Sequence, residues 1–207
     1  MIDFNKLKEP FPADKIEWRV QRSKIKDGKP TAIVLAYVQA RAIQDRLDDI
    51  FGWHGWMTEV RDLSGGIICR LSVKAGDEWI HKEDGSPETK VEAFKGGISK
   101  ALVRVASSGF GIGRYLYELG VSYAKFETNG IYSAKIDGNW YKWNPPTLPD
   151  WALPSMITAE QMGTWTDIAS SADISVKDLS LKFGLTKRTT EKDADEMIKQ
   201  ALAHYQK

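Results

Sequence analysis

The chain has 207 residues, of which 42% are hydrophobic and 28% are charged, which excludes a disordered chain and fits a folded domain with an appendage. Its 29 Lys and Arg residues nearly balance 28 Asp and Glu residues, so the net charge of +1 excludes a bulk attraction to nucleic acid or membrane. The single cysteine, Cys69, excludes an internal disulfide and a thiolate metal site within one chain.

The first half of the chain predicts a β-rich core. Residues 16–23 and 31–38 are rich in β-forming residues and flank the turn-like KDGKP, which predicts a hairpin. Residues 39–52 place apolar side chains at helical spacing and end in Gly52, which predicts a helix with a glycine stop. Residues 56–82 return to alternation, with SGG and GD between the segments, and predict a three-stranded antiparallel meander.

A second helix is predicted from the Ser86-Pro87 pair to about Ser107, followed by a glycine-rich turn. Its apolar stripe should lie on the meander and consists of Phe94, Ile98, Ala101, Leu102 and Val105. Lys100 and Arg104, four residues apart, fall beside this stripe, so we expect them at the edge of the contact between helix and sheet.

Positive charge is concentrated in this second helix and the turn after it. Between residues 90 and 114 the only acid is Glu92, and the five cations are Lys90, Lys95, Lys100, Arg104 and Arg114. Such local charge is what contact with a phosphate backbone requires. The alternative is an ordinary solvated helix face, which these residue types form just as readily.

The last third of the chain predicts a separate helical module. Residues 145–157 are proline-rich and predict a linker between a core at 1–144 and a helical domain at 158–207. The T-x-x-Q at Thr158 and the T-x-x-D at Thr190 indicate helix starts. Seven bases against eight acids over residues 151–207 argue against strong DNA binding by this module and favour a protein partner, with a solubility or oligomer-stabilising role as the alternative.

Two motifs resemble the Rad-fifty-two family of DNA single-strand annealing proteins, in its phage and prophage branch. The first is IVLAYVQARAIQDRLDDIFGWHGW, and the second is FKGGISKALVRVASSGFGIGRYLY. The resemblance implies an α+β fold with a β-β-β-α annealing core, in which an antiparallel meander sheet is packed by a basic helix. It also implies rings or helical arcs of identical subunits that hold single-stranded DNA along an outer groove and anneal complementary strands without ATP, a cofactor or a metal.

The resemblance also indicates site residues. The family's arginine after AYV maps to Arg41, although an ungapped alignment with the eukaryotic members puts Ala42 there. Its basic pair maps to Val103 and Arg104, or to Arg104 and Val105, so Arg104 is kept in both alignments and we infer that Lys100 compensates for the other cation. The complete set of expected DNA contacts is Arg41, Arg46, Lys95, Lys100, Arg104 and Arg114.

The sequence also suggests two rival functions and several partners. Glu88-x-Lys90, with Asp77, Glu83 and Asp84 upstream, is reminiscent of metal-dependent nucleases, but a position opening a helix does not suit that site. A recombination adaptor without DNA affinity is the other rival. We expect a non-enzymatic, cytoplasmic protein without a membrane segment, whose helical domain binds a host single-strand-binding protein or a phage exonuclease.

Overall fold

The computed structural model describes residues 2–87, 93–186 and 189–205, and for residues 93–95 it describes only the backbone. The chain divides into two compact units, residues 1–152 and residues 153–207. The division falls within the proline-rich stretch, whose Leu148 and Ala152 are buried. Each unit is described by itself below.

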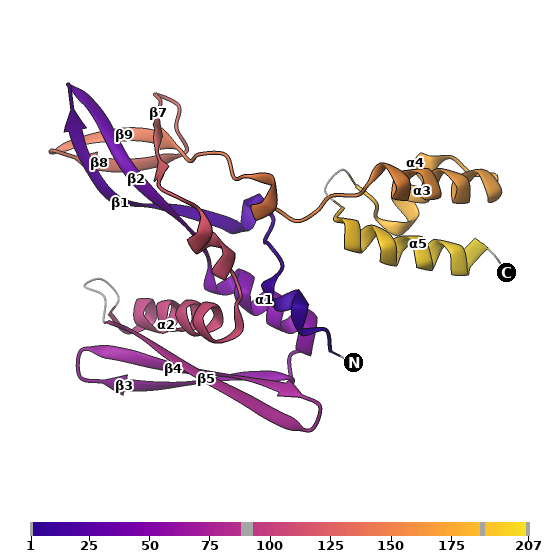
Figure 1. The fold of residues 1–207 in the computed structure, drawn as a ribbon, viewed down its shortest axis with the longest axis horizontal. Helices are drawn as coiled ribbons and strands as arrows, with labels where there is room; N and C mark the ends of the chain where they lie inside the picture. Colours follow the sequence, from indigo (N-terminus) through magenta and orange to yellow (C-terminus); the bar gives the residue numbers. More distant parts are fainter. Residues whose placement is uncertain (1, 88–92, 187–188, 206–207) are drawn as a thin grey trace. The chain divides into compact units, whose positions relative to one another are not determined.

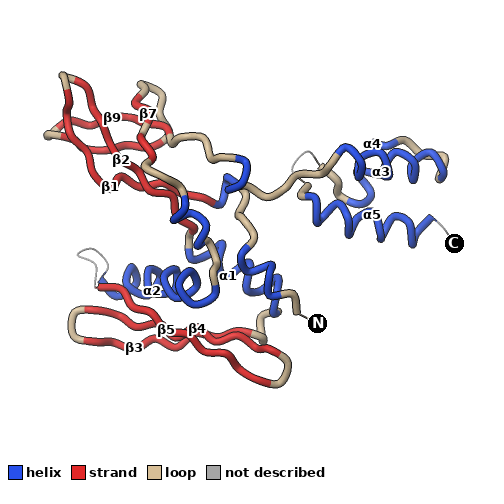
Figure 2. Tube along the Cα trace, in the orientation of Figure 1, coloured by secondary structure: helices blue, strands red, loops and turns tan. Residues whose placement is uncertain are grey.

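The first unit opens with a long antiparallel hairpin formed by β1 (Ile16–Lys26) and β2 (Lys29–Val38), as predicted. Asp27 and Gly28 both have positive φ, at 50° and 74°, which is the two-residue turn that matches the twist of a hairpin. The short strand β6 (Ser122–Tyr123) pairs with β2 and completes the first sheet. Figures 1 and 2 show this hairpin at the far end of the unit from the meander sheet.

A second sheet packs beside this hairpin and has the order β7-β9-β8. Its strands are β7 (Lys125–Phe126), β8 (Tyr132–Ile136) and β9 (Asn139–Asn144). Another two-residue turn, with Asp137 and Gly138 at positive φ, joins β8 to β9. Trp143 is buried and stacks on Tyr132 with a centroid separation of 4.6 Å, so an aromatic pair lies at the centre of this layer.

The predicted meander is the third sheet, with the order β3-β4-β5. Its strands are β3 (Trp56–Leu63), β4 (Gly66–Ala75) and β5 (Glu78–Pro87). The buried face of β4 carries Ile67, Cys69, Leu71 and Val73, at the spacing of two that a strand requires. Burial raises the pKa of the Cys69 thiol to about 11.

Two helices lie next to the meander sheet. The predicted first helix is α1 (Ala40–Phe51), which buries Ile43 and Leu47 and ends at Gly52 with φ 69°. The second is α2 (Ala93–Phe110), which packs on β4 and β5. After α2 the chain turns through a 3-10 segment, η3 (Arg114–Glu118). The α+β class with antiparallel sheets is therefore confirmed.

The predicted start of the second helix is wrong. Ser86 and Pro87 belong to β5, where they pair with Ile67 and Gly66 of β4, and α2 begins at Ala93. Proline is tolerated here because β5 is an edge strand and Pro87 is its last residue. A Ser-Pro pair can open a helix or end a strand. Here the pairing with β4 places it at the end of β5.

The second unit is a three-helix module, formed by α3 (Ala159–Ser171), α4 (Val176–Phe183) and α5 (Glu191–Tyr205). Thr158 and Gln161 form the predicted reciprocal cap, and Thr190 accepts from the Asp193 N–H at 3.2 Å. Trp165 lies fully buried at the centre of the module and donates from Nε1 to Ser180 Oγ at 3.0 Å. Within the described parts of both units, no helix has the length and apolar character needed to cross a bilayer.

Candidate nucleic-acid interface

The helix α2 lies close against the meander sheet because Gly97 faces β4 and Gly109 faces β5. A Cβ on Gly97 would come within 2.6 Å of Ile67 Cδ1, and a Cβ on Gly109 within 2.6 Å of Lys82 Cβ. The Ser86 hydroxyl donates to the Gly97 carbonyl at 2.9 Å. Helix and strand therefore run antiparallel, and alternate β5 residues, Lys82 among them, point toward α2.

A row of polar side chains follows this contact along α2. Lys100, Arg104 and Ser108 are spaced four apart, so they lie above one another on one edge of the helix, and all three are exposed. Arg104 Nε donates to Asp84 Oδ1 at 3.1 Å, and Ser108 Oγ donates to Asp84 Oδ2 at 2.8 Å. Lys100 makes no ion pair with any residue that the structure describes.

Asp84 is the acid of this row. Its side chain is 20% exposed, and burial alone would raise its pKa. Hydrogen bonds from Ser108, from the Gly85 N–H at 2.7 Å and from Arg104 outweigh that effect, so the pKa of Asp84 lies below its usual value. Asp84 is therefore ionised at neutral pH and neutralises part of the Arg104 charge, while 57% of the Arg104 side chain stays exposed.

A groove of about 180 Å³ lies on the other side of α2, between the helix, β2 and the segment after α2. Val103 and Ser107, one residue before Arg104 and Ser108 respectively, line it from α2, and Arg19 and Tyr37 line it from the hairpin. Its remaining lining is mostly apolar or backbone and includes Ile43, Ile112, Leu116 and Tyr117. The cation row and the groove are thus neighbouring faces of the same helix.

The hairpin side of the groove has its own polar network. Tyr37 donates to Glu17 Oε2 at 2.6 Å, and Gln39 donates to the other oxygen of the same carboxylate. Burial, together with the bond to Glu17 and the negative charge of Glu17, raises the pKa of Tyr37 to about 12. Tyr37 is therefore a neutral, fixed wall of the groove at physiological pH.

Arg41 lies in the first turn of α1, is exposed and makes no ion pair with another described residue. It lies in the helix that follows β2 and is not among the residues that line the groove, whereas Lys100 and Arg104 lie on the β5 side of α2. Arg41 and the pair Lys100 and Arg104 therefore belong to two different helices, α1 and α2.

Three other predicted contacts have different surroundings. Arg46 donates to the carbonyls of Glu9 and Pro10 and stacks over the Phe11 ring at 3.5 Å, and its pKa is lowered by burial. Arg114 donates to the Ser107 and Ser108 carbonyls at 2.8 and 2.5 Å, where it caps the end of α2. These two arginines hold backbone in place. The side chain of Lys95 lies outside the described residues.

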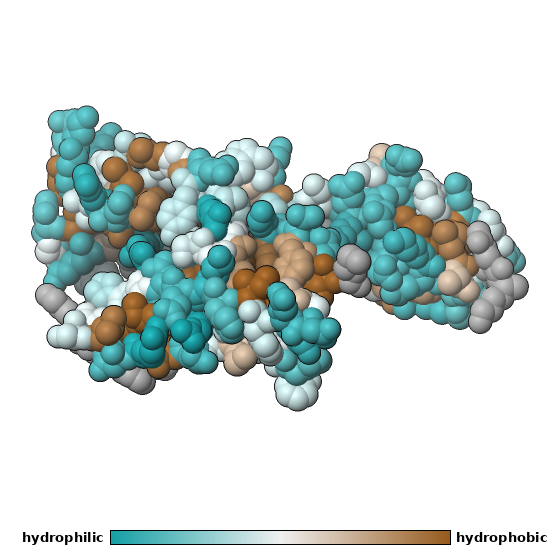
Figure 3. Space-filling view, turned by 60° about the horizontal axis from the view of Figure 1, so that its bottom comes forward, coloured by the Kyte–Doolittle hydropathy of each residue, from teal (hydrophilic) through white to brown (hydrophobic). Residues whose placement is uncertain are grey.

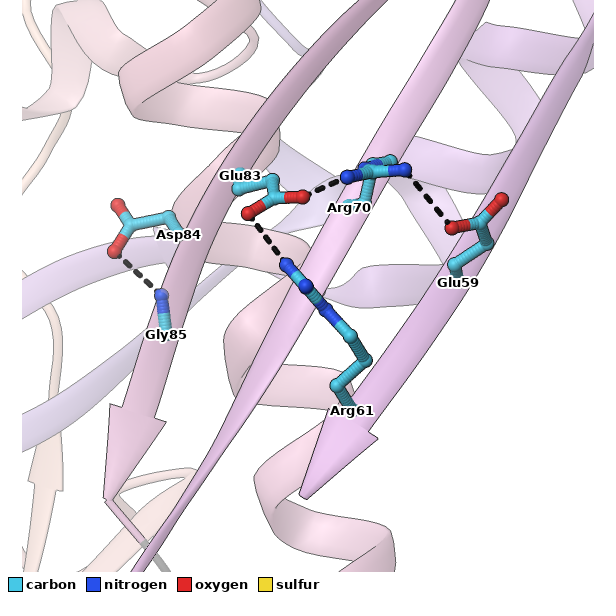
Figure 4. A network of polar contacts seen from close by, with 6 residues as sticks. All are labelled: Glu59, Arg61, Arg70, Glu83, Asp84 and Gly85. Carbon is cyan, nitrogen blue, oxygen red and sulfur yellow. Dashed lines mark hydrogen bonds and ion pairs between the residues drawn. The ribbon is translucent and has the colours of Figure 1, made fainter. Parts of the chain in front are cut away.

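The face of the meander opposite α2 carries a balanced ion-pair network (Figure 4). Glu83 accepts from Arg70 and from Arg61, both at 2.6 Å, and Arg70 also reaches Glu59 at 3.2 Å. The hydrogen bond from Arg70 and the two nearby positive charges hold the pKa of Glu83 below its usual value. Two arginines and two glutamates satisfy one another here, so this face offers little net charge to a polyanion.

The nuclease motif falls partly outside the described residues, because Glu88 and Lys90 lie in the gap at 88–92. Of the acids upstream, Glu83 belongs to the network above and Asp84 faces α2. Within the part of the chain that the structure describes, no group of three or more His, Cys, Asp or Glu residues is arranged to hold a metal ion. This motif was expected to open a helix, which spoke against a nuclease site. Pro87 instead ends a strand, so that expectation does not count against the motif.

Sequence reasoning missed one set of cations, on β1. Arg19, Arg22, Lys24 and Lys26 are all exposed, and Arg19 lines the groove. The signal was present as a cation at every second residue from 22 to 26, the period of a strand. In the view of Figure 3, apolar side chains form separate patches among hydrophilic ones on the surface of the protein.

The fold and the site define the class of protein. It has an α+β core in which a helix with a row of cations packs on a meander sheet, beside a groove walled by a hairpin. The family described as "Rad52/22 family double-strand break repair protein" matches residues 4–129, and the chain belongs to this family. The assignment to a phage or prophage branch stays a prediction.

Two relatives carry the name "Single-stranded DNA-binding protein DdrA". That of Deinococcus radiodurans is 32% identical over 151 residues, covering 72% of this chain and 66% of the relative. That of Deinococcus deserti is 31% identical over 159 residues, covering 72% of this chain and 69% of the relative. The matched region thus spans about two thirds of each relative's length.

Proposed function

We propose that this protein binds single-stranded DNA and anneals complementary strands without nucleotide hydrolysis, in recombination and DNA repair. Membership of the family and the names of the two relatives support this. The single structural observation that carries it is the exposed row of Lys100 and Arg104 on α2, next to the groove that Val103 lines.

The row suits a phosphate backbone. Lys100 has no described partner and can neutralise a phosphate directly, whereas Arg104 can exchange its exposed contact with Asp84 for one. The groove is largely apolar and has no row of base-reading side chains, so binding does not depend on base identity. Cations that hold the backbone leave the bases free, and pairing with a second strand supplies the sequence information.

Annealing needs a strand longer than one groove of about 180 Å³ can hold. We therefore propose that copies assemble into a ring or helical arc in the cytoplasm, so that successive grooves form one track. Neighbouring subunits also raise the local concentration of cations along the strand, which favours cooperative binding.

The second unit is proposed to bind a protein partner. It has its own core around Trp165, a proline-rich connection and one more acid than base over residues 151–207. A host single-strand-binding protein or an exonuclease would bring this module to resected DNA, and neither requires the module itself to contact phosphate.

The test is the salt dependence of single-stranded DNA binding. Each neutralised phosphate contributes about 0.7 to the slope of log K against log salt. K100A/R104A should lower its magnitude by about 0.7 if only Lys100 contacts DNA and by about 1.4 if Arg104 also does. The matched control is K177A/K199A, which removes two exposed lysines from the second unit and should leave the slope unchanged.

The same preparation distinguishes the rival functions. Labelled single strands incubated with magnesium should stay intact and form duplex with their complement. Fragments would favour the nuclease, and absence of DNA binding by the wild-type protein would favour the adaptor. An unchanged slope in K100A/R104A would remove the assignment of the site to α2.

A further inference from the structure

The first strand of the hairpin presents a line of cations on one face. Strand alternation places Arg22, Lys24 and Lys26 on the same side of β1. The register of β1 on β2 shifts between Val20 and Arg22, so that Gln21 is an extra residue. Because of this bulge, Arg19 faces the same side as Arg22 even though Arg22 is the third residue after it.

This face holds little compensating charge. All four cations are exposed, and none has an ion pair with another residue that the structure describes. The acids of the hairpin are Asp27 in its turn and Glu17 at the start of β1, which accepts from the neutral Tyr37 and Gln39, so four cations stand against two acids. Lys26 is also directly opposite Lys29 across the hairpin, an arrangement that destabilises a sheet unless an anion relieves it.

The line of cations begins at the groove. Arg19 lines the groove together with Leu35 and Tyr37 of β2, and Leu35 pairs with Arg19 across the hairpin. On the same face, Tyr123 of β6 pairs with Ile33 and is 55% exposed. The surface therefore runs without a change of face from the groove to the hairpin turn.

We propose that this β1 face, defined by Arg19, Arg22, Lys24 and Lys26, binds the phosphate backbone of the single strand where it leaves the groove. The inference rests on the proposed function and extends its site by an element that the sequence motifs do not include. The occupant is the strand already bound in the groove, because Arg19 belongs to both surfaces.

The spacing fits this ligand. Alternate residues of a strand are about 6.8 Å apart, a separation of the same order as that of neighbouring phosphates along an extended single strand. Arg22, Lys24 and Lys26 can therefore each meet a phosphate without bending the strand, and the recognition requires no contact with the bases.

The test removes these charges without touching the groove. R22Q/K24Q/K26Q should lower the magnitude of the salt slope for an oligodeoxynucleotide by about 2, which is about 0.7 for each of three phosphates. Between 50 and 200 mM salt, the wild-type protein should then lose about 20-fold more affinity than the variant. The charge-preserving R22K/K24R/K26R should keep the wild-type slope, which excludes a simple effect on folding.

A matched control removes three charges from another sheet face of the same unit. K125Q/K135Q/K142Q changes exposed lysines on β7, β8 and β9, none of which lines the groove, and should leave the slope unchanged. An equal fall in this control would overturn the proposal, because the effect would then be one of overall charge. An abasic oligodeoxynucleotide should show the same loss in R22Q/K24Q/K26Q as ordinary DNA, and no loss on the abasic strand would overturn the assignment to phosphate.

The outcomes separate this inference from the proposed function. Wild-type protein that binds no single strand refutes both. Normal single-strand affinity and slope in R22Q/K24Q/K26Q, with weakened binding in K100A/R104A, refutes only the β1 face. Unchanged single-strand binding with slower annealing in R22Q/K24Q/K26Q also refutes it, because the cations would then meet the incoming strand.

Discussion

Asp84 opposes the binding of DNA by Arg104, and replacing it should strengthen binding while weakening the fold. In D84N the carboxylate that accepts from Arg104 at 3.1 Å becomes a neutral amide. Arg104 is then free, and the magnitude of the salt slope for single-stranded DNA should rise by up to about 0.7, the contribution of one phosphate. Fluorescence anisotropy with a labelled oligonucleotide between 50 and 200 mM salt measures this change.

The cost to stability follows from the same bonds. The amide keeps one acceptor oxygen, which can serve the Gly85 N–H, and presents its NH2 group to Ser108, whose hydroxyl must then accept. The bonds also lose their charge assistance, so we expect a loss of about 1–2 kcal/mol. Urea unfolding at pH 7 measures it. Because the folded pKa of Asp84 lies below its unfolded value of about 3.9, the stabilisation is present above that pH and disappears as the pH falls through the folded pKa. The difference between wild type and D84N should therefore shrink in acid.

The result that would refute this reasoning is weaker DNA binding by D84N at an unchanged slope. Asp84 would then act by positioning α2, and it would not compete with DNA for Arg104. D84N/R104A provides the control, since removing Arg104 in the D84N background should lower the slope by the full 0.7 or so.

Three further predictions concern the supports of the site. G97A should lose about 1–3 kcal/mol in urea unfolding, because its Cβ would meet Ile67 at 2.6 Å, whereas G163A, with open space around it in α3, should gain about 0.5–1 kcal/mol. R46A should lower the unfolding free energy by about 2–3 kcal/mol through loss of its charged bonds to backbone, with the DNA salt slope unaltered, and a reduced slope would show direct contact with DNA. W165A should unfold the second unit, at a cost of about 3–5 kcal/mol, and leave the anisotropy titration of single-stranded DNA intact.

Local pattern was sufficient for most of the fold. Asp-Gly turns with positive φ, a glycine after α1 and alternating apolar residues in β4 are each short-range signals, and the corresponding elements were predicted close to their observed ends. The wrong prediction of a helix start at Ser86-Pro87 has the opposite cause, a contact between residues that are distant in the sequence. The last two residues of β5 are strand only because Ile67 and Gly66 pair with them, and that partner is 19 to 21 residues away in the sequence.

The position of the proposed site on α2 was predictable from the sequence, but the state of charge of its residues was not. Helical spacing put Lys100 and Arg104 at the edge of the sheet contact, and the structure agrees. That Arg104 is paired with Asp84, and that Arg46 is held by the carbonyls of Glu9 and Pro10, depends on contacts between distant segments. A cation in a sequence looks the same whether it is free or already bonded, so composition overstates the charge available to DNA.

The burial of Cys69 has a practical consequence for labelling the protein with a fluorescent dye. Its side chain is 1% exposed and its thiol has a pKa of about 11, so almost none of it is thiolate at neutral pH. Maleimide dyes should therefore spare it in the folded protein. A cysteine placed at an exposed position such as Asp27 or Gln21 would be the reactive one, and a single fluorophore there could report on the β1–β2 hairpin without first removing the native thiol.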